Sequence, residues 1–451
     1  MIIILFISLI GVLIIGLTSN ELIKILPIYI YILGTISLYR ILNKEKFNFV
    51  IWIILGLLLV RNMYLINEEV SSLKTVLLIC YETFIIFLTI HISYIIFFKN
   101  KENEKNKEQK IDASMHIKKG TKLLIILIIL LVAIFPMILD NYSFLIQTTV
   151  EERNNALVAM QNIKTSMPAL IRIFIGYFLE PLRIFLSLYL INFLYKKYSE
   201  TNKGKYVRWS FYLVILNAAI MTERKLFSIL LACALAVLLL YIYPKFRKTI
   251  TLFSVVGILF VLLFVLIYKS YILKDKTDFE FKQTAEAYIS NSYRNVETSI
   301  EMSEEYEKQY SVMDKLHMLI NGDTMTTFAI IQYFFQGETT TTYLFNETYY
   351  QGAKRYDQII PMIGQGYFYF GFVFSVLFEV AFIVMAMYYY KKVILEEMLS
   401  KKFLYIFISL LLVVMPFFYN YSIFVTYLTV YIIPTAILIN LNKDRLKDDR
   451  V

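Results

Sequence analysis

Runs of apolar residues, interrupted by short charged links, recur along almost the whole chain. Several runs reach about 20 residues, the length that an α-helix needs to cross the hydrocarbon core of a bilayer. Of the 451 residues, 58% are hydrophobic and 18% are charged, whereas soluble domains carry more charge. The sequence therefore predicts an all-α polytopic membrane protein. Cys80 and Cys233 lie in separate apolar runs, which indicates neither a disulfide framework nor a zinc site.

The links between the apolar runs indicate how the chain is oriented. Lys and Arg are retained on the cytoplasmic side of membrane spans, and the link 99–122 carries eight Lys against four acidic residues. This rule predicts about twelve spans with both termini in the cytoplasm. The first run has no basic leader and no small-residue cleavage site, so we interpret it as a span and not a signal peptide. The expected spans are residues 1–18, 22–42, 49–66, 76–98, 123–139, 169–195, 209–221, 226–243, 249–268, 367–390, 403–419 and 423–441.

The longest polar segment is residues 269–366. It carries nine Lys or Arg against fourteen Asp or Glu, although the whole chain is net +10. We expect this acidic segment on the outer side, because basic residues are retained inside. The chain then divides into transmembrane helices 1–9 with short loops (1–268), a mostly helical extracytoplasmic loop (269–366), and transmembrane helices 10–12 with a cytoplasmic tail (367–451).

The run 169–195 contains three charged residues, and each costs several kcal/mol at membrane depth. Eleven residues turn a helix by about 1100°, so Arg172 and Arg183 project within about 20° of each other. Glu180 precedes Arg183 by three residues and can neutralise it. The two arginines fit either a cavity that binds an anionic group or an internal ion-pair ladder that positions helices.

Other ionisable residues near membrane depth have a structural interpretation. Arg61 is near the outer end of its span and can extend its charge to the surface. Glu82 and His91 are nine residues apart and lie on opposite faces of one helix; we interpret His91 as a packed, hydrogen-bonded residue. Arg224 lies in a tight link at the outer membrane surface, where it is either an anion-binding group or an ordinary interfacial residue.

Helices are predicted in the polar segment over residues 288–297, 301–310 and 313–320, and the last of these carries His317. The Asn-Gly-Asp sequence at 321–323 is typical of a turn. Four aromatic residues between 343 and 350 are candidates for a sugar-binding wall, because flat rings stack on sugar faces. Aromatic residues are also common at membrane interfaces.

Three local patterns accompany this layout. The link Met221-Thr-Glu-Arg224-Lys-Leu-Phe227 places an Arg at the start of the following span. Residues 288–297 form a helix with Tyr and Asn, and the span after the loop begins with the Gly- and aromatic-rich run 364–371. Arg355 and Gly366 also have an Arg-x10-Gly spacing. In these features the chain resembles the bacterial oligosaccharide repeat-unit polymerases, the Wzy or O-antigen polymerase family.

Two positions depart from that family's pattern. Thr222 and Glu223 stand where a small, Gly-rich pair usually precedes the Arg, and Gln365 stands where a carboxylate is often found.

The resemblance implies an integral-membrane architecture similar to the GT-C glycosyltransferases and the O-antigen ligases and polymerases. It implies an enzyme that joins polyprenyl-diphosphate-linked oligosaccharide units into surface polysaccharide (O-antigen, capsule or exopolysaccharide), without a metal or cofactor. The reaction would take place at the outer face of the bacterial cytoplasmic membrane. Further implied partners are the lipid bilayer, a flippase and a chain-length regulator, and no nucleic acid.

The same resemblance suggests which residues act. Arg suits a diphosphate leaving group because its planar fork binds phosphate oxygens bidentately. The base would be a carboxylate or a His, and His317 is the His that the expected topology places outside. The predicted catalytic residues are His317 and Arg224; the predicted substrate- or diphosphate-binding residues are Arg172, Arg224, Arg294, Arg355 and Tyr367; the predicted structural residues are Glu180, Arg183, Gly366 and Gly371.

Three alternative functions remain. A lipid-linked oligosaccharide flippase has a similar number of spans, but it has short loops and two related halves, which this chain lacks. An O-antigen ligase, which transfers finished glycan to another acceptor, shares the layout and the chemistry. A transporter or sensor would use the same kind of scaffold without catalysis.

Overall fold

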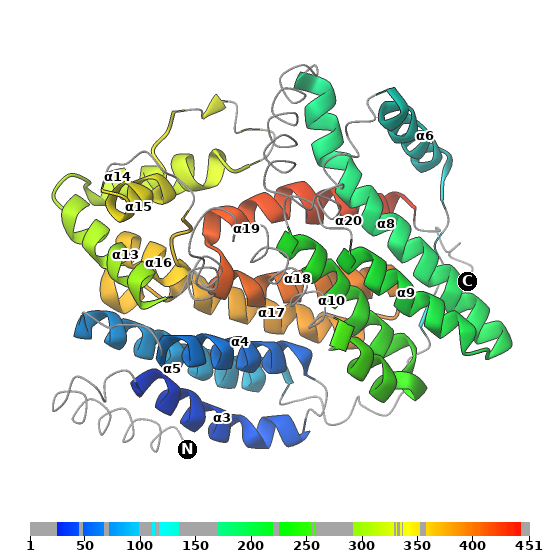
Figure 1. Cartoon of the computed structure of the whole chain (residues 1–451), viewed down its shortest axis with the longest axis horizontal. Coiled ribbons are helices and arrows are strands. Elements are labelled where there is room, and N and C mark those ends of the chain that lie inside the picture. Colours follow the sequence, from blue (N-terminus) through cyan, green and yellow to red (C-terminus); the bar gives the residue numbers. More distant parts are fainter. Residues whose placement is uncertain are drawn as a thin grey trace, which may run out of the picture. The chain divides into compact units, whose positions relative to one another are not determined.

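The computed structural model describes residues 25–44, 48–66, 72–98, 111–112, 115, 117–134, 169–219, 225–254, 256–257, 292–328, 331, 334–335, 337–351 and 358–442. Every named element in these ranges is a helix (Figure 1), and an isolated bridge pairs Asp112 with Met398. The all-α class predicted from the apolar runs is therefore confirmed.

The elements follow one another along the chain with short connections. They are α3 (Leu26–Lys44), α4 (Phe49–Ile66), α5 (Leu73–Phe98), α6 (Lys119–Ile134), α8 (Ala169–Thr201), α9 (Lys205–Ala219), α10 (Lys225–Ile242), η2 (Pro244–Phe246), α13 (Tyr293–Tyr306), α14 (Val312–His317), η3 (Met318–Met325), α15 (Thr341–Tyr349), α16 (Met362–Phe374), α17 (Leu377–Leu395), α18 (Leu399–Phe418), α19 (Tyr421–Tyr427), η5 (Leu428–Ile432) and α20 (Ile433–Leu441).

Four helices in the described ranges are long and apolar enough to cross a membrane, namely Leu73–Phe98, Tyr177–Thr201, Leu399–Phe418 and the continuous rod Tyr421–Leu441. Two further helix pairs qualify if each bent pair is counted as one span, which gives up to six. These helices indicate a membrane protein. The count of about twelve spans stays a prediction, and the expected spans at 1–18 and, beyond residue 257, at 249–268 lie outside the described residues.

The expected straight span at 367–390 is wrong. The chain forms α16 and α17 instead, and the two helices are bent by 99°. Gly371 causes the local break, because its φ of 72° and ψ of −174° lie in a region that is essentially restricted to glycine. The run is apolar throughout, so its hydropathy gave no sign of the bend.

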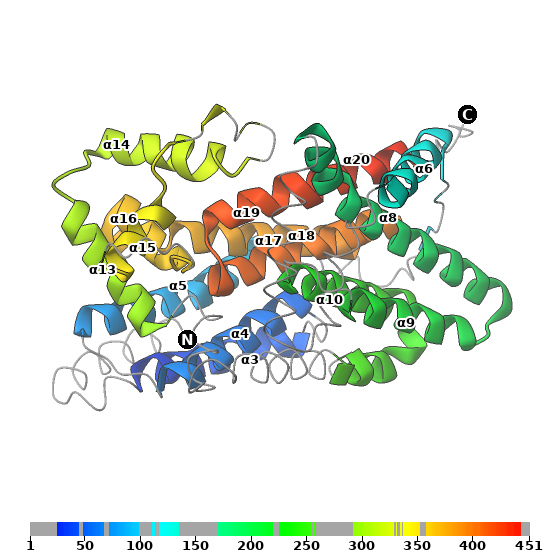
Figure 2. The same ribbon diagram turned by 45° about the horizontal axis from the view of Figure 1, so that its top comes forward.

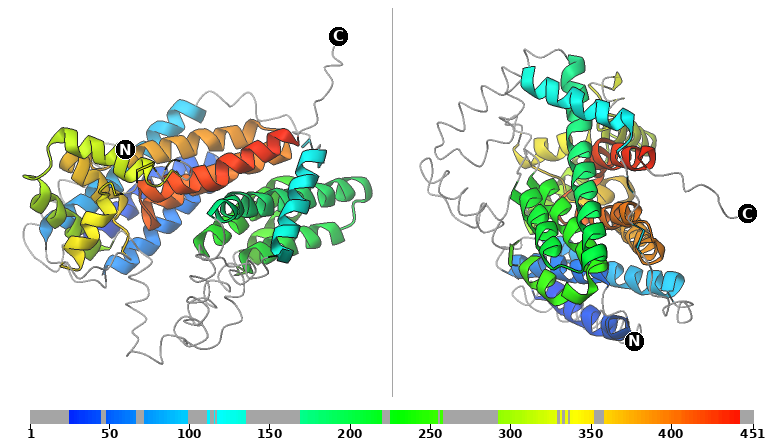
Figure 3. Two further views of the ribbon diagram at one scale, coloured as in Figure 1. Left: turned by 90° about the horizontal axis from the view of Figure 1, so that it is seen from above. Right: turned by 90° about the vertical axis from the view of Figure 1, so that its right-hand side faces the viewer.

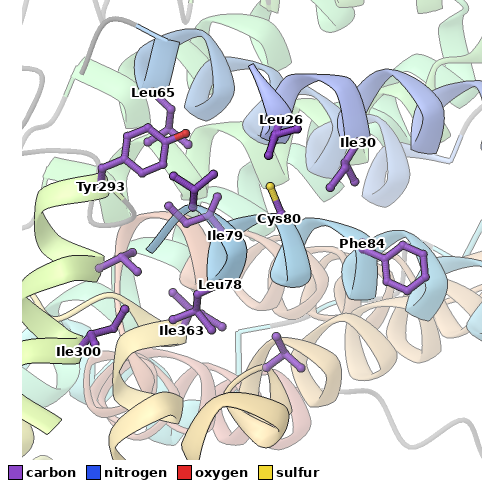
Figure 4. Close-up of a cluster of buried hydrophobic side chains, with 13 residues drawn as sticks. Leu26, Ile30, Leu65, Leu78, Ile79, Cys80, Phe84, Tyr293, Ile300 and Ile363 are labelled. Carbon is purple, nitrogen blue, oxygen red and sulfur yellow. The ribbon is translucent and has the colours of Figure 1, made fainter. Parts of the chain in front are cut away.

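One compact unit comprises residues 1–107, 282–391 and 408–427. Its core joins the N-terminal helices to the described part of the polar segment (Figure 4). Buried side chains of α3, α4 and α5, including Leu26, Leu65 and Ile79, pack with Tyr293 of α13 and Ile363 of α16. Helix α13 is thus part of this unit's core and not a detached appendage.

The other compact unit comprises residues 108–281, 392–407 and 428–451. In it α8, α9 and α10 pack side by side (Figures 2 and 3). Phe227 of α10 stacks on Tyr431 of η5 with ring centroids 4.1 Å apart. This stacking fixes α10 against the C-terminal helices of the same unit.

Gly366 leads to the first prediction. After the break at Gly371 the chain returns, and a Cβ built on Gly366 would overlap the carbonyl oxygen of Ser375. Backbone cannot move away as a flexible side chain can, and overpacking typically costs about 1–3 kcal/mol or more. We expect Gly366→Ala to lower the thermal unfolding midpoint and the yield of monodisperse purified protein.

Gly56 provides a matched control. It lies in helix α4, and a Cβ there would meet nothing within 4 Å. Because Ala is the better helix former by about 1 kcal/mol, Gly56→Ala should leave the midpoint unchanged or raise it. Equal midpoints for the Gly366 and Gly56 variants would contradict the close approach.

Candidate functional site

Helix α16 is the point at which several separate segments meet. It packs against α13 and lies beside α15 (Figure 1). Three of its consecutive residues each contact a charged group from another element: Tyr367 contacts Lys74 of α5, Phe368 contacts Lys315 of α14, and Tyr369 contacts Asp323 of η3. We call this arrangement, together with Gln365 and Thr341, the α16 site.

Asp323 is the buried centre of the α16 site, with an exposed fraction of 0%. Its Oδ2 accepts hydrogen bonds from the Thr341 hydroxyl at 2.5 Å, the Gln365 Nε2 at 2.5 Å and the Tyr369 hydroxyl at 2.8 Å. Its Oδ1 accepts from the Thr341 backbone N–H at 3.0 Å. Four bonds to one carboxyl group tie η3, α15 and α16 together.

Gln365 connects this centre to the last helices of the unit. Its Oε1 accepts a hydrogen bond from the backbone N–H of Tyr421 at 3.0 Å. A backbone N–H can only donate, so the amide oxygen must face Tyr421 and the amide nitrogen must face Asp323. A second link joins Asn420 to the Thr342 hydroxyl at 3.2 Å. Gln365 therefore has a defined orientation and a structural task at the position where the polymerase family often has a carboxylate.

Asp323 was not predicted from the sequence, and the expected turn at 321–323 is wrong. These residues continue the helix as the π-helical segment η3. Gly322 is needed there for space, because a Cβ would overlap the carbonyl oxygen of Thr339. The glycine was therefore a signal of close packing, but the Asn-Gly-Asp composition gave it the appearance of a turn.

Burial raises the pKa of Asp323 above its ordinary value, and the hydrogen bonds from Thr341, Tyr369 and Gln365 oppose this rise. A raised pKa means that the folded state binds the proton more tightly than the unfolded state does. The contribution of Asp323 to stability is therefore fully present below the ordinary Asp pKa of about 4, and it is lost as the pH rises through the folded-state value.

This linkage can be measured against Asp323→Asn, which cannot titrate. We expect the wild-type unfolding midpoint, minus that of the variant, to be largest near pH 4 and to decrease toward pH 8. Other carboxyl groups cancel in the difference. An advantage that grows with pH would show that the hydrogen bonds outweigh burial.

Three cations surround the aromatic residues of this unit. Lys74 forms an ion pair with Glu304 at 2.6 Å, and its Nζ lies 5.4 Å from the centre of the Tyr367 ring. Arg294 lies 4.6 Å above the Tyr349 ring. Cations held over aromatic faces keep a defined position while their outer side stays accessible.

Lys315 is the third cation and is half-buried. Its Nζ donates to the Phe368 carbonyl oxygen at 2.9 Å and lies 4.7 Å from that residue's ring centre. Burial lowers its pKa. An ammonium group has three donors, and in the described residues Lys315 forms no ion pair, so donors remain for an anionic ligand. No sequence pattern distinguished Lys315 from the other lysines.

The predicted catalytic base, His317, lies at the surface with its side chain 59% exposed. Its Nε2 bonds to the Asn321 amide at 2.7 Å, and its Nδ1 is 3.8 Å from the Glu338 carboxylate. A carboxylate beside a His is the arrangement that orients a general base, although 3.8 Å is longer than a hydrogen bond. His317, Arg294 and Tyr367 belong to the same compact unit.

The remaining predicted residues have different outcomes. Arg183 pairs with Glu180 at 3.2 Å, as their spacing predicts, and also donates to Asn217 and Ser228. The backbone of Arg172 lies in α8. Arg224 and Arg355 lie outside the described residues, as does the short helix start at 288–291.

The expected sugar-binding wall is only partly accessible. Phe345 is fully buried and packs with Met302 and Phe368, whereas Tyr343 is 42% exposed. Tyr349 and Tyr350 are half-buried and in edge contact with each other. Helix α15 therefore uses one aromatic residue for the core and leaves the tyrosines for contact with ligand.

Within the described residues, no group of three or more His, Cys, Asp or Glu side chains could hold a metal ion. A reaction without a metal stays a prediction. Comparison of the chain with protein-family models, with curated proteins and with solved structures finds no match.

Proposed function

We propose that this protein polymerises polyprenyl-diphosphate-linked oligosaccharide repeat units into surface polysaccharide at the outer face of the bacterial cytoplasmic membrane. The observation that carries the proposal is the convergence of two lysines and a buried carboxylate on Tyr367, Phe368 and Tyr369. Helix α16 leads directly into the bent apolar pair with α17. Cations next to aromatic rings beside membrane helices fit a substrate that joins sugars, a diphosphate and a lipid.

The reaction transfers a glycosyl group between two such substrates. A hydroxyl oxygen of the acceptor sugar attacks the anomeric carbon of the donor, a glycosidic bond forms, and the bond to the diphosphate oxygen breaks. The hydroxyl proton goes to a base, for which His317 beside Glu338 is the candidate. The polyprenyl diphosphate leaves as an anion, and fixed cations stabilise the charge that develops on it.

The described side chains supply three such cations, Lys74, Lys315 and Arg294. Lys315 is the best placed for the diphosphate, because it is held at its carbonyl contact and still has free donors. Tyr349 and Tyr350 would stack on sugar rings. Arg172, Arg224 and Arg355 remain candidates from the sequence for binding the diphosphate.

The polymerase, flippase and ligase functions differ in what accumulates when the gene is deleted. We expect lipid-linked or surface glycan of one repeat unit, located on the outer leaflet. Units retained on the inner leaflet would indicate a flippase, and free, full-length polymer on its lipid carrier would indicate a ligase. Either result would contradict the proposal.

The proposed outer location of the polar segment is a separate prediction. Met313 is 72% exposed, and no hydrogen bond to its side chain would be lost in Met313→Cys. A membrane-impermeant maleimide should label this cysteine in intact cells. Asn103→Cys, in the expected cytoplasmic link, should react only after lysis. The wild-type protein measures the background from Cys80 and Cys233, and a reversed pattern would contradict the topology.

A further inference from the structure

Arg61 and Glu82 form a buried ion pair between α4 and α5. The Arg61 Nη1 is 2.7 Å from the Glu82 Oε2, its Nη2 donates to the Thr83 hydroxyl at 2.6 Å, and the two side chains are 2% and 0% exposed. The guanidinium also lies 5.8 Å from the centre of the Phe417 ring. The expectation that Arg61 extends to the membrane surface is wrong, because Glu82 supplies a partner inside the helix bundle.

Glu379 adds a second carboxylate to this region. It lies in the first turn of α17 and is 0% exposed. Neither of its carboxyl oxygens accepts a hydrogen bond from another residue in the described part of the chain. The ionisable groups that act on it electrostatically are Glu82 and Arg61.

The packing of the helices places these groups at a common level. Tyr390 of α17 contacts Phe49 of α4 and Phe98 of α5, with ring centroids 5.3 and 5.6 Å away. At 1.5 Å per residue, Arg61 lies about 18 Å along α4 from this contact, and Glu379 lies about 16 Å along α17. Arg61 and Glu379 thus occupy the same depth, and Glu82 is fixed there by its bond to Arg61.

The charges of this cluster do not balance. Arg61 neutralises Glu82, so an ionised Glu379 leaves one uncompensated negative charge in a dry helix bundle. Burying such a charge costs several kcal/mol. The positive end of α17 returns about 0.3–1 kcal/mol, which is too little to compensate. Neutrality requires one further positive charge.

Two observations indicate that this charge comes from a bound cation. The first is the pair of unpartnered, fully buried carboxyl oxygens of Glu379. The second is the 99° bend between α16 and α17 immediately before Glu379, because ion sites in membrane proteins are often built at such broken helices. We infer that Glu379, beside the Arg61–Glu82 pair, is a binding site for one monovalent cation, either a proton or an alkali-metal ion. This site does not depend on the proposed polymerase function.

The test uses the purified full-length protein and its unfolding midpoint. NaCl is titrated against choline chloride at constant ionic strength, at several pH values between 5 and 9, for the wild type, Glu379→Gln and Glu301→Gln. Glu301 is an exposed carboxylate on α13 and serves as the control. A midpoint that rises with sodium identifies an alkali-metal site, and one that rises only with acidity identifies a proton site.

In both cases Glu379→Gln should lose the dependence, because its amide needs no counter-ion, and Glu301→Gln should retain it. A Glu379→Gln protein with the full wild-type response would overturn the inference. If that variant does not fold, the wild type alone decides. Dicyclohexylcarbodiimide should modify Glu379, as detected by mass spectrometry, and either sodium or alkaline pH should slow the modification at least tenfold. Modification unaffected by both would also overturn the site.

Discussion

Asp323→Ala should lower the unfolding midpoint of the purified protein more than any other single substitution of a charged residue in α13–α15. The change removes the acceptor for the Thr341 backbone N–H, the Gln365 amide and the Tyr369 hydroxyl, all at a fully buried position. A buried donor without a partner costs about 1–3 kcal/mol, so three of them imply a loss of about 3 kcal/mol or more.

Asp314 is the control for Asp323. Its exposed carboxylate closes a capping box with Ser311 at the start of α14. Asp314→Ala should cost about 1 kcal/mol, the usual value of a helix cap. Differential scanning fluorimetry of the detergent-solubilised proteins gives both midpoints. Similar shifts for the two variants would show that the Asp323 network does not hold η3 and α15 on α16.

Arg224→Ala and Arg172→Ala should each reduce polymer formation by about 10²-fold, because removing one donor to a developing anion typically has this effect. The amount of folded protein should be unchanged. Lys at either position should restore activity only in part, since it lacks the bidentate fork of Arg. The measurement is the amount and chain length of surface glycan in a deletion strain that expresses each variant, normalised to protein level.

Arg183 distinguishes this effect from a general loss of intramembrane charge. Its guanidinium bonds to Glu180, Asn217 and Ser228, so Arg183→Ala leaves a buried carboxylate without its cation. We expect this variant to lower the amount of folded protein. Normal polymer from both Arg224→Ala and Arg172→Ala, at normal expression, would show that the diphosphate binds elsewhere.

The helical framework was accessible from the sequence because it depends on local composition. The apolar run at 49–66 predicts the bounds of α4, and the spacing of Glu180 and Arg183 predicts their ion pair. His91 is also packed and hydrogen-bonded as expected, through the carbonyl oxygens of Phe87 and Ser37. In each case the prediction required information from only a few neighbouring residues.

The groups that define the α16 site could not be found in this way. Asp323 binds Gln365 across 42 positions of the chain, and Arg61 meets Glu82 across 21. Such partners are chosen by tertiary packing, which leaves no periodic signal in the sequence. The bend at Gly371 was missed for a related reason, because hydropathy records how apolar a run is and not the direction of its backbone.

The most direct test of the polymerase proposal uses purified protein in liposomes with lipid-linked oligosaccharide extracted from the deletion strain. The products are separated by size after incubation with EDTA present. We predict a ladder of glycans that increases by whole repeat units, with one polyprenyl diphosphate released for each new linkage. Substrate that remains a single unit, whether or not it crosses the bilayer, would contradict the proposed function.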